Sequence, residues 1–317
     1  MAISSEQTLP VVHVTDLPSD EIADRWLVEQ LWCANSVGVI GGAPKCAKTW
    51  LGLDMALSVA TGTPCLGKYH VAERGPVLIY LAEDALRSVR ERIEGMACHR
   101  GLELDQVEVY VITTPLLRLD QDLDRMRLWE TTRRLRPRLV VLDPLVRLHG
   151  IDENRAGEVA ELLAYFRSMQ RELGLSVLLV HHTRKNALDG VAAGQGLRGS
   201  GDIHAFGDSN LYLRRTEQHL ILSSEHRAAP ASSPIYLRLA VTDVATTHLE
   251  VIPEPHGENG RGLEERVLDL LAQGDVVTRT GLRDALGVNN ERLGKALESL
   301  ERAGRVSRTP HGWRSLR

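Results

Sequence analysis

The chain has 317 residues, of which 43% are hydrophobic and 25% charged, and an aromatic content of 4% requires an aliphatic core. A net charge of −4 excludes a global basic field, so any nucleic-acid contact must come from a local patch or a channel lining. Four widely spaced cysteines without a C-x-x-C pair indicate neither a zinc site nor a disulfide framework. Because the polar N-terminus carries no signal h-region and no apolar run approaches the ~18 residues that span a bilayer, we expect a cytoplasmic protein.

Residues 1–25 form a polar segment with two prolines and several acidic residues. Such a segment is either a frayed terminus or an arm that packs on a neighbouring subunit, and the sequence favours neither. Short apolar stretches at 26–28 and 31–32 then lead into the first buried strand.

The stretch 36–53, SVGVIGGAPKCAKTWLGL, has the order of a phosphate-binding P-loop: buried strand, loop of small residues, then Lys48-Thr49 opening an apolar helix. Loop amides and a helix N-terminus present donors and partial positive charge to phosphate oxygens. We expect Lys48 to reach the β- and γ-phosphates and Thr49 to ligate Mg²⁺. The residues predicted to bind the nucleotide are Gly42, Ala43, Pro44, Lys45, Cys46, Ala47, Lys48, Thr49 and Trp50.

Ala47 departs from the P-loop pattern, which has glycine at the position before the lysine. Glycine is used there because backbone and ligand approach closely and a Cβ disfavours the required φ and ψ. Either a small loop shift accommodates the methyl group or nucleotide binding is weakened. The alternative to a P-loop is an ordinary strand–turn–helix with a chance Lys-Thr pair.

The apolar run 76–82 is typical of a buried strand, and it ends at Glu83-Asp84 before an arginine-rich helix. A carboxylate at the carboxyl end of such a strand lies where α/β sheets place their ligands. Glu83 could polarise the water that attacks a γ-phosphate. The alternative is structural, with Asp84 capping the helix and Glu83 favouring its first turn.

A third strand at 107–112 and a charged helix at 120–136 precede the apolar run 139–142, which ends in Asp143. This is the Walker B pattern, in which a buried strand delivers a carboxylate to the Mg²⁺ shell. A strand that ends in Asp is common by chance, but its place about ninety residues after a P-loop makes the functional interpretation stronger.

A helix at 155–173 is followed by a fifth apolar strand at 175–182, which ends in His181-His182. Adjacent strand residues point to opposite faces, so the pair is a poor metal site. One histidine can sense the γ-phosphate while the other packs; a satisfied core histidine is the alternative.

The glycine-rich stretch 184–206 is read as a loop and contains Arg184, Lys185 and Arg198. It suits either a loop that grips a nucleic-acid backbone in a ring channel or a disordered crossover. Strands at 209–215, 219–227 and 235–241 follow. The predicted class is α/β, a mostly parallel, doubly wound sheet with a β-rich edge.

Residues 253–262, with two prolines and three glycines, read as a linker between a domain at 26–252 and a small domain at 263–317. The small domain reads as three helices and a two-strand wing, a winged helix-turn-helix with Arg292 and Lys295 facing outward. From residue 261 onward there are eleven Arg/Lys against eight Asp/Glu, which favours nucleic-acid binding over a protein-interaction module.

The P-loop, Glu83, Asp143, the His-His strand and the glycine-rich segment occur in the order found in RecA/DnaB-like ATPases. Over about residues 26–250 the chain resembles the RepA-type hexameric replicative helicases of plasmids and mobile elements. The motifs that carry the resemblance are GGAPKCAKTWLGLDMALSVATGTPCLG, VLIYLAEDALRSVRERI, RLVVLDPL, VLLVHHTRK and LRGSGDIHAFGDSNLYLRR. Their combination is specific, whereas each motif is weak by itself.

The resemblance implies a RecA-like fold and a ring, usually of six subunits, with ATP and Mg²⁺ between neighbours. Glu83 would activate water, Asp143 would support the metal and His182 would sense the γ-phosphate. Arg214, or less strongly Arg215 or Arg198, would be an arginine finger supplied in trans. The segment 184–198 would line the channel and grip single-stranded DNA.

Together these features predict an ATP-hydrolysing DNA motor that acts as a helicase in the replication of a mobile element. Two alternatives stay open. One is an ATP-dependent DNA-binding regulator or recombination and repair accessory without unwinding activity, which recruits others through the winged helix. The other is a non-catalytic scaffold, in which Ala47 cripples turnover and ATP serves only assembly.

Overall fold

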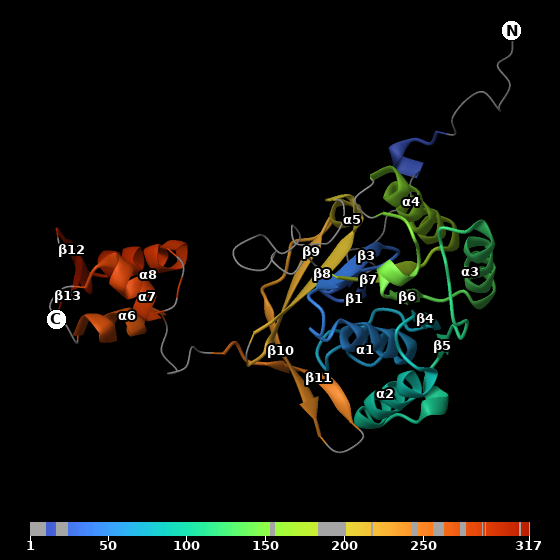
Figure 1. Cartoon of the computed structure of the whole chain (residues 1–317), viewed down its shortest axis with the longest axis horizontal. Coiled ribbons are helices and arrows are strands. Elements are labelled where there is room, and N and C mark those ends of the chain that lie inside the picture. Colours follow the sequence, from blue (N-terminus) through green and yellow to red (C-terminus); the bar gives the residue numbers. More distant parts are fainter. Residues whose placement is uncertain are drawn as a thin grey trace, which may run out of the picture. The chain divides into compact units, whose positions relative to one another are not determined.

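A computed structural model describes residues 11–16, 25–152, 156–182, 201–216, 218–242, 246–255, 263–272, 277–286, 288, 290–310 and 312–316. The chain divides into two compact units, Met1–Ile252 and Pro253–Arg317, and each is described by itself. Figure 1 labels the helices and strands used below. In the described segments, no helix combines the length and the apolar character that crossing a membrane requires.

The first unit is built on a nine-stranded sheet in the order β11-β10-β9-β8-β3-β7-β6-β4-β5. Six of these strands run parallel, namely β8 (Ser209–Arg215), β3 (Val37–Gly42), β7 (Ser176–His182), β6 (Leu139–Asp143), β4 (Val77–Leu81) and β5 (Val109–Val111). The antiparallel part consists of β9 (Leu220–His226), β10 (Ile235–Val241) and β11 (Thr247–Ile252). The α/β class, the parallel sheet and its β-rich edge are confirmed.

Helices cover both faces of the sheet, which explains why its central strands are apolar throughout. On one face lie α1 (Lys48–Thr61) and α2 (Leu86–His99), and on the other α3 (Asp122–Leu135) and α4 (Ala156–Leu173) (Figure 1). All six residues of β3 are buried, as are all five of β4 and of β6. The carboxyl ends of the parallel strands therefore meet at one edge of a rigid, doubly covered layer.

Short elements complete the first unit. A small hairpin pairs β1 (Trp26–Val28) with β2 (Trp32–Cys33), and short 3-10 turns lie at η2 (Val14–Asp16), η4 (Leu104–Gln106) and η5 (Leu145–Arg147). The sequence interpretation of 184–206 as one loop is wrong at its end, where α5 (Gly201–Phe206) is helical. The reason is tertiary packing: Ile203 is buried in the core beneath α4, and the Asn210 side chain donates to the His204 carbonyl.

The second unit contains α6 (Leu263–Ala272), α7 (Arg279–Leu286) and α8 (Asn290–Arg302), followed by the antiparallel pair β12 (Val306–Thr309) and β13 (Gly312–Ser315). Its own apolar core joins the three helices to the hairpin through Leu282, Leu297 and Trp313, among others. Val277 forms a bridge to Trp313 and so ties the start of α7 to β13.

Candidate nucleotide-binding site

The turn between β3 and α1 has the backbone geometry of a tight phosphate-binding loop. Lys45 and Ala47 both have left-handed conformations, with φ of 63° and 67°. A Cβ added at Gly42 would lie 2.5 Å from the Leu213 carbonyl oxygen and 2.6 Å from the Cys46 sulfur, so glycine is required there by close packing. Ala47 keeps the conformation that glycine favours, at a cost of about 1–2 kcal/mol for its Cβ.

Lys48 is the first residue of α1, and its side chain is folded back over the loop. The Nζ atom donates to the Gly42 carbonyl at 2.9 Å and the Ala43 carbonyl at 2.8 Å, and lies 3.2 Å from His182 Nδ1. Burial lowers the pKa of this ammonium group. The loop carbonyls therefore hold a cation at the point where a phosphate oxygen could replace them as its partner.

The N-terminus of α1 opens toward the same place. The N-cap residue is Ala47, and in the described chain no side chain caps the helix with a hydrogen bond. The first amides of a helix lack partners within the helix. They are consequently available to an anion, and the helix dipole adds partial positive charge.

Asp143 ends β6 next to Thr49 and is almost fully buried. Burial raises the pKa of its carboxyl to about 6, against the opposing effects of Thr49 and then Lys48. Within the described residues, its buried Oδ2 atom has no hydrogen-bond partner. A buried carboxylate oxygen without a partner, beside a threonine hydroxyl, fits the oxygen shell of Mg²⁺.

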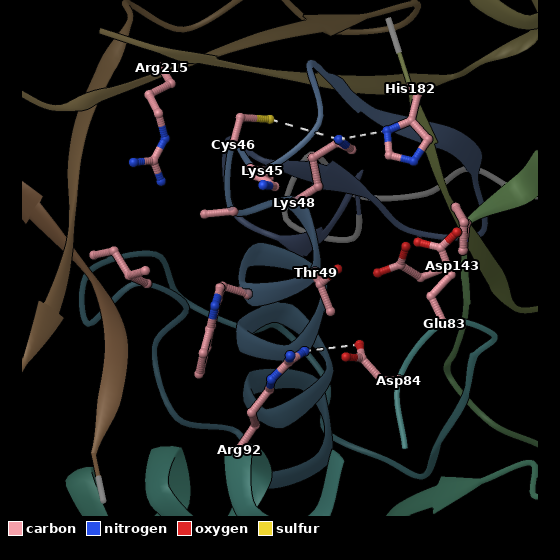
Figure 2. A pocket seen from close by; sticks show the side chains of 14 residues that line it. Lys45, Cys46, Lys48, Thr49, Glu83, Asp84, Arg92, Asp143, His182 and Arg215 are labelled. Atoms are coloured by element: carbon pink, nitrogen blue, oxygen red, sulfur yellow. Dashed lines mark hydrogen bonds and ion pairs between the residues drawn. The ribbon is translucent and has the colours of Figure 1, made fainter. Parts of the chain in front are cut away.

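A cavity of about 280 Å³ collects these groups at the carboxyl edge of the sheet (Figure 2). Figure 2 shows Thr49 in the middle, with Glu83 and Asp143 on one side and Arg215 on the other. The predicted residues that line the cavity are Lys45, Cys46, Ala47, Lys48, Thr49, Trp50, Glu83, Asp143 and His182. Gly42, Ala43 and Pro44 lie at the start of the loop, where the first two supply the carbonyls that bind Lys48. The residues present thus fit a nucleoside triphosphate with Mg²⁺.

The two adjacent histidines at the end of β7 separate as strand alternation requires. His182 lines the cavity, whereas His181 is buried. The sensor role of His182 stays a prediction.

Three charged residues line the cavity without having been predicted as part of it. Arg92, on α2, donates to Asp84 at 2.9 Å and lies 5.3 Å from the centre of the Trp50 ring. Arg215, at the end of β8, lies on the opposite wall of the cavity (Figure 2). Arg92 lies about two turns after the start of α2, but choosing it among the three arginines of this helix required its contacts.

The neighbouring Arg214 and Arg215 project to opposite faces of the sheet. Leu213 packs in the core on the α1 side and Tyr212 in the core on the α4 side. Because side chains alternate along a strand, Arg215 shares the face of Leu213 and Arg214 the face of Tyr212. Arg215 therefore reaches its own subunit's cavity, and Arg214, the residue predicted as a finger, is directed away from it.

The predicted nucleic-acid contacts are described only in part. Arg184, Lys185 and Arg198 lie outside the described residues. Arg292 belongs to α8, but its side chain is not described, and Lys295 is exposed on the same helix.

Fold and site together define a P-loop ATPase with a RecA/DnaB-like fold. The profile of the family described as AAA domain matches residues 4–187, more than half of the chain, so the chain belongs to that family.

The chain aligns with two solved structures. The structure of a DnaB-like replicative helicase and its interactions with primase aligns with a TM-score of 0.51 and 14% sequence identity, over 68% of this chain and 57% of that one. The crystal structure of the RadB recombinase aligns with a TM-score of 0.46 and 18% identity, over 65% of this chain and 88% of that one. This chain thus spans little more than half the length of the helicase that it resembles.

Proposed function

We propose that this chain is an ATP-hydrolysing, ring-forming DNA motor, specifically a replicative-type helicase of a mobile element. The observation that carries the proposal is the convergence of five strand ends on one cavity. β3, β4, β6, β7 and β8 deliver the P-loop, Glu83, Asp143, His182 and Arg215, respectively. Phosphoryl transfer is catalysed mainly by holding the reacting groups in position and by stabilising developing charge, and cations and carboxylates around a triphosphate can do both.

Each residue then has a distinct task. Lys48 exchanges its loop carbonyls for phosphate oxygens, and Glu83 orients the attacking water. Asp143 and Thr49 would hold Mg²⁺, which would neutralise charge at the phosphates. His182 would respond to the same phosphate, and its Nδ1 atom lies 3.2 Å from Lys48 Nζ.

The base of the nucleotide has a matching surface beside the P-loop. The Trp50 ring and the Arg92 guanidinium face one another in the cavity wall, and Asp84 fixes the guanidinium. Both groups have planar faces on which a purine can stack. We assign the adenine to this surface.

Self-assembly is supported by an apolar groove at the outer edge of the sheet. The groove has a volume of about 750 Å³ beside β5 and α3 and is lined by Tyr110, Leu117 and Leu128, among others. The segment 11–16 carries three exposed valines and one acidic residue, Asp16. The groove carries Arg127 and Arg134 together with Asp124, which pairs with Arg127 at 3.3 Å. We assign the groove to this segment of a neighbouring copy.

The second unit supplies a further contact for nucleic acid. Arg302, Arg305, Arg308 and Arg314 are exposed along the end of α8 and the β12–β13 hairpin. Clustered arginines of this kind bind phosphate backbones. The unit is therefore proposed as a winged helix that touches DNA, with a protein partner as the alternative outcome.

The test is ATP hydrolysis with and without single-stranded DNA, followed by strand displacement on a forked substrate. Wild type should hydrolyse ATP, and DNA should stimulate it; Lys48→Ala should abolish hydrolysis. Stimulated hydrolysis without strand displacement would favour the regulator or recombination accessory. A Lys48→Ala rate equal to wild type would refute the site assignment.

A mixing experiment tests whether the ring is completed by a neighbour. An inactive Lys48→Ala variant mixed with an inactive Arg214→Ala variant should regain activity, because some interfaces then combine an intact P-loop with an intact finger. The matched control is Arg215→Ala, which lines its own subunit's cavity and whose activity should not be regained by mixing. Recovery with Arg215→Ala but not with Arg214→Ala would mean that Arg215 is the finger supplied to the neighbour and that Arg214 acts within its own subunit.

A further inference from the structure

The second unit ends in a basic stretch that no acidic residue balances. After Glu301 the sequence contains five arginines and neither Asp nor Glu. Four of them are described and exposed, and we call them the C-terminal arginines: Arg302, Arg305, Arg308 and Arg314. In the described part of this unit, Arg283 pairs with Asp284 at 2.7 Å, whereas no C-terminal arginine has an acidic partner. Their positive charges are therefore available to an anionic surface.

Two of the C-terminal arginines project from opposite faces of the β12–β13 hairpin. Arg308 lies opposite Trp313 in the ladder. Arg314, the next residue on β13, lies opposite Ser307 and donates from Nε to the Ser307 hydroxyl at 3.1 Å. Because cross-strand partners share a face and successive residues alternate, Arg308 lies on the face of Trp313 and Arg314 on the other. A narrow hairpin thus carries a cation on each side.

Such a hairpin matches a groove of double-stranded nucleic acid. A phosphate backbone borders each side of a duplex groove, and the major groove of B-form DNA admits a two-stranded β-ribbon. A ribbon with a cation on each face can contact both backbones at once. A single strand offers only one backbone, so it would leave one of the two faces without a phosphate.

The aromatic content of the unit separates duplex binding from single-strand binding. Proteins that bind single strands stack successive bases on aromatic side chains. Trp313 is the one Phe, Tyr or Trp in the sequence after residue 253. It is buried in the core that joins the helices to the hairpin. The unit can therefore hold phosphates, but it presents no aromatic ring to an unpaired base.

The apolar content of the surface favours nucleic acid over a protein partner. The core of a protein–protein interface is built from apolar and aromatic side chains. In the described part of the second unit, Leu316, at 40%, is the single large apolar side chain that is exposed. Contacts with a phosphate backbone need no apolar anchor. A duplex backbone therefore fits this surface better than a protein does.

We propose that the β12–β13 hairpin lies in a groove of double-stranded DNA and that the C-terminal arginines bind both backbones. Phosphate contacts carry no sequence information, so this binding is independent of sequence. The inference rests on the proposed function for the choice of DNA over RNA, and it names the form of DNA that the second unit takes. The chain then has two different tracks, a single strand at the proposed ring channel and a duplex at the second unit.

The test is binding of the full chain, without nucleotide, to a fluorescent DNA duplex of mixed sequence. Anisotropy gives the affinity at several salt concentrations. One phosphate contact contributes about 0.9 to the slope of log affinity against log salt, which is about eightfold in affinity at 0.1 M salt. Arg308→Ala and Arg314→Ala should therefore each reduce the slope by about 0.9 and the affinity by about fivefold to tenfold.

Two variants separate lost phosphate contacts from damage to the unit. Arg314→Lys keeps the positive charge and should keep the slope. The matched control is Arg283→Ala, which removes the same charge from an arginine of this unit that is paired with Asp284. It should leave the slope unchanged. A slope that falls equally in Arg283→Ala and Arg308→Ala would mean that net charge, and not the hairpin, determines binding, and it would overturn the inference.

Single strands and hydrolysis provide the remaining comparisons. Arg308→Ala and Arg314→Ala should change the affinity for oligothymidylate by less than about twofold. An equal loss on oligothymidylate and duplex, or equal competition by duplex RNA, would overturn the inference, while ATP hydrolysis stimulated by single strands would still support the motor. Duplex binding that depends on these arginines in a chain that hydrolyses no ATP would support the inference and remove the proposed function.

Discussion

Replacing Ala47 by glycine should stabilise the first unit, because this alanine holds a left-handed backbone at the N-cap of α1, with φ 67° and ψ 24°. A residue with a Cβ pays about 1–2 kcal/mol for this conformation, whereas glycine pays almost nothing. Glycine also has more conformational freedom in the unfolded chain, which offsets about 0.5–1 kcal/mol of this stabilisation. The net stabilisation is about 0.5–1 kcal/mol, which raises the melting temperature of a unit of this size by about 1–4 °C.

The assay is thermal unfolding followed by circular dichroism, with Ala56→Gly as the matched control. Ala56 is buried in the middle of the same helix, so its replacement should lower stability by about 1 kcal/mol or more. Because Ala47 already has the glycine-like conformation, Ala47→Gly should change ATP affinity by no more than about twofold. A lower melting temperature for Ala47→Gly would refute the assignment of strain to this residue. A large rise in ATP affinity would mean that the alanine methyl group weakens nucleotide binding in the natural loop.

Three further changes test the electrostatics and the assembly. Arg100→Met should lower the free energy of unfolding by about 3–5 kcal/mol, because Asp54 then loses its buried 2.7 Å ion pair with Arg100 and stays charged without a partner. The measurement is urea unfolding, and an unchanged midpoint would contradict this expectation. Burial, reinforced by the stacked His99 ring, lowers the pKa of His248, so the unfolded chain takes up a proton that the fold disfavours. Stability should therefore fall as pH drops below about 6.5, and His248→Asn should flatten that dependence of melting temperature on pH, whereas an equal slope would exclude this origin. Val12→Asp should reduce the oligomer mass measured by light scattering, and an unchanged mass would remove the segment 11–16 from the interface.

Local sequence patterns were sufficient for most of the sheet. Continuous apolar runs such as 139–142 predicted buried parallel strands, because helices on both faces require every residue to be apolar. The ends of these apolar runs likewise placed Asp143 and Glu83 at the carboxyl ends of two strands, and so at one edge of the sheet. Composition failed for α5, where a glycine-rich stretch becomes helical because Ile203 is buried against α4.

The rest of the site depends on register, which local patterns do not contain. Arg215 enters the cavity because Gly42 pairs in parallel with Leu213, two residues earlier on β8 and on the same face. The pairing of Glu83 with Arg147 likewise joins two residues that are 64 positions apart in sequence and that follow β4 and β6. Such contacts follow from the strand order, and the strand order was not predicted from the sequence.

The alternation of Arg214 and Arg215 on β8 has a mechanical consequence. Both side chains are attached to one strand that β3 and β9 hold from either side, so a rotation of β8 about its own axis would move the two guanidinium groups in opposite directions. If the cavity holds a triphosphate as proposed, its contact with Arg215 would therefore also move Arg214 on the other face of the sheet. If copies of the chain assemble as proposed, this coupling would let the nucleotide of one subunit change the contact that Arg214 makes with its neighbour.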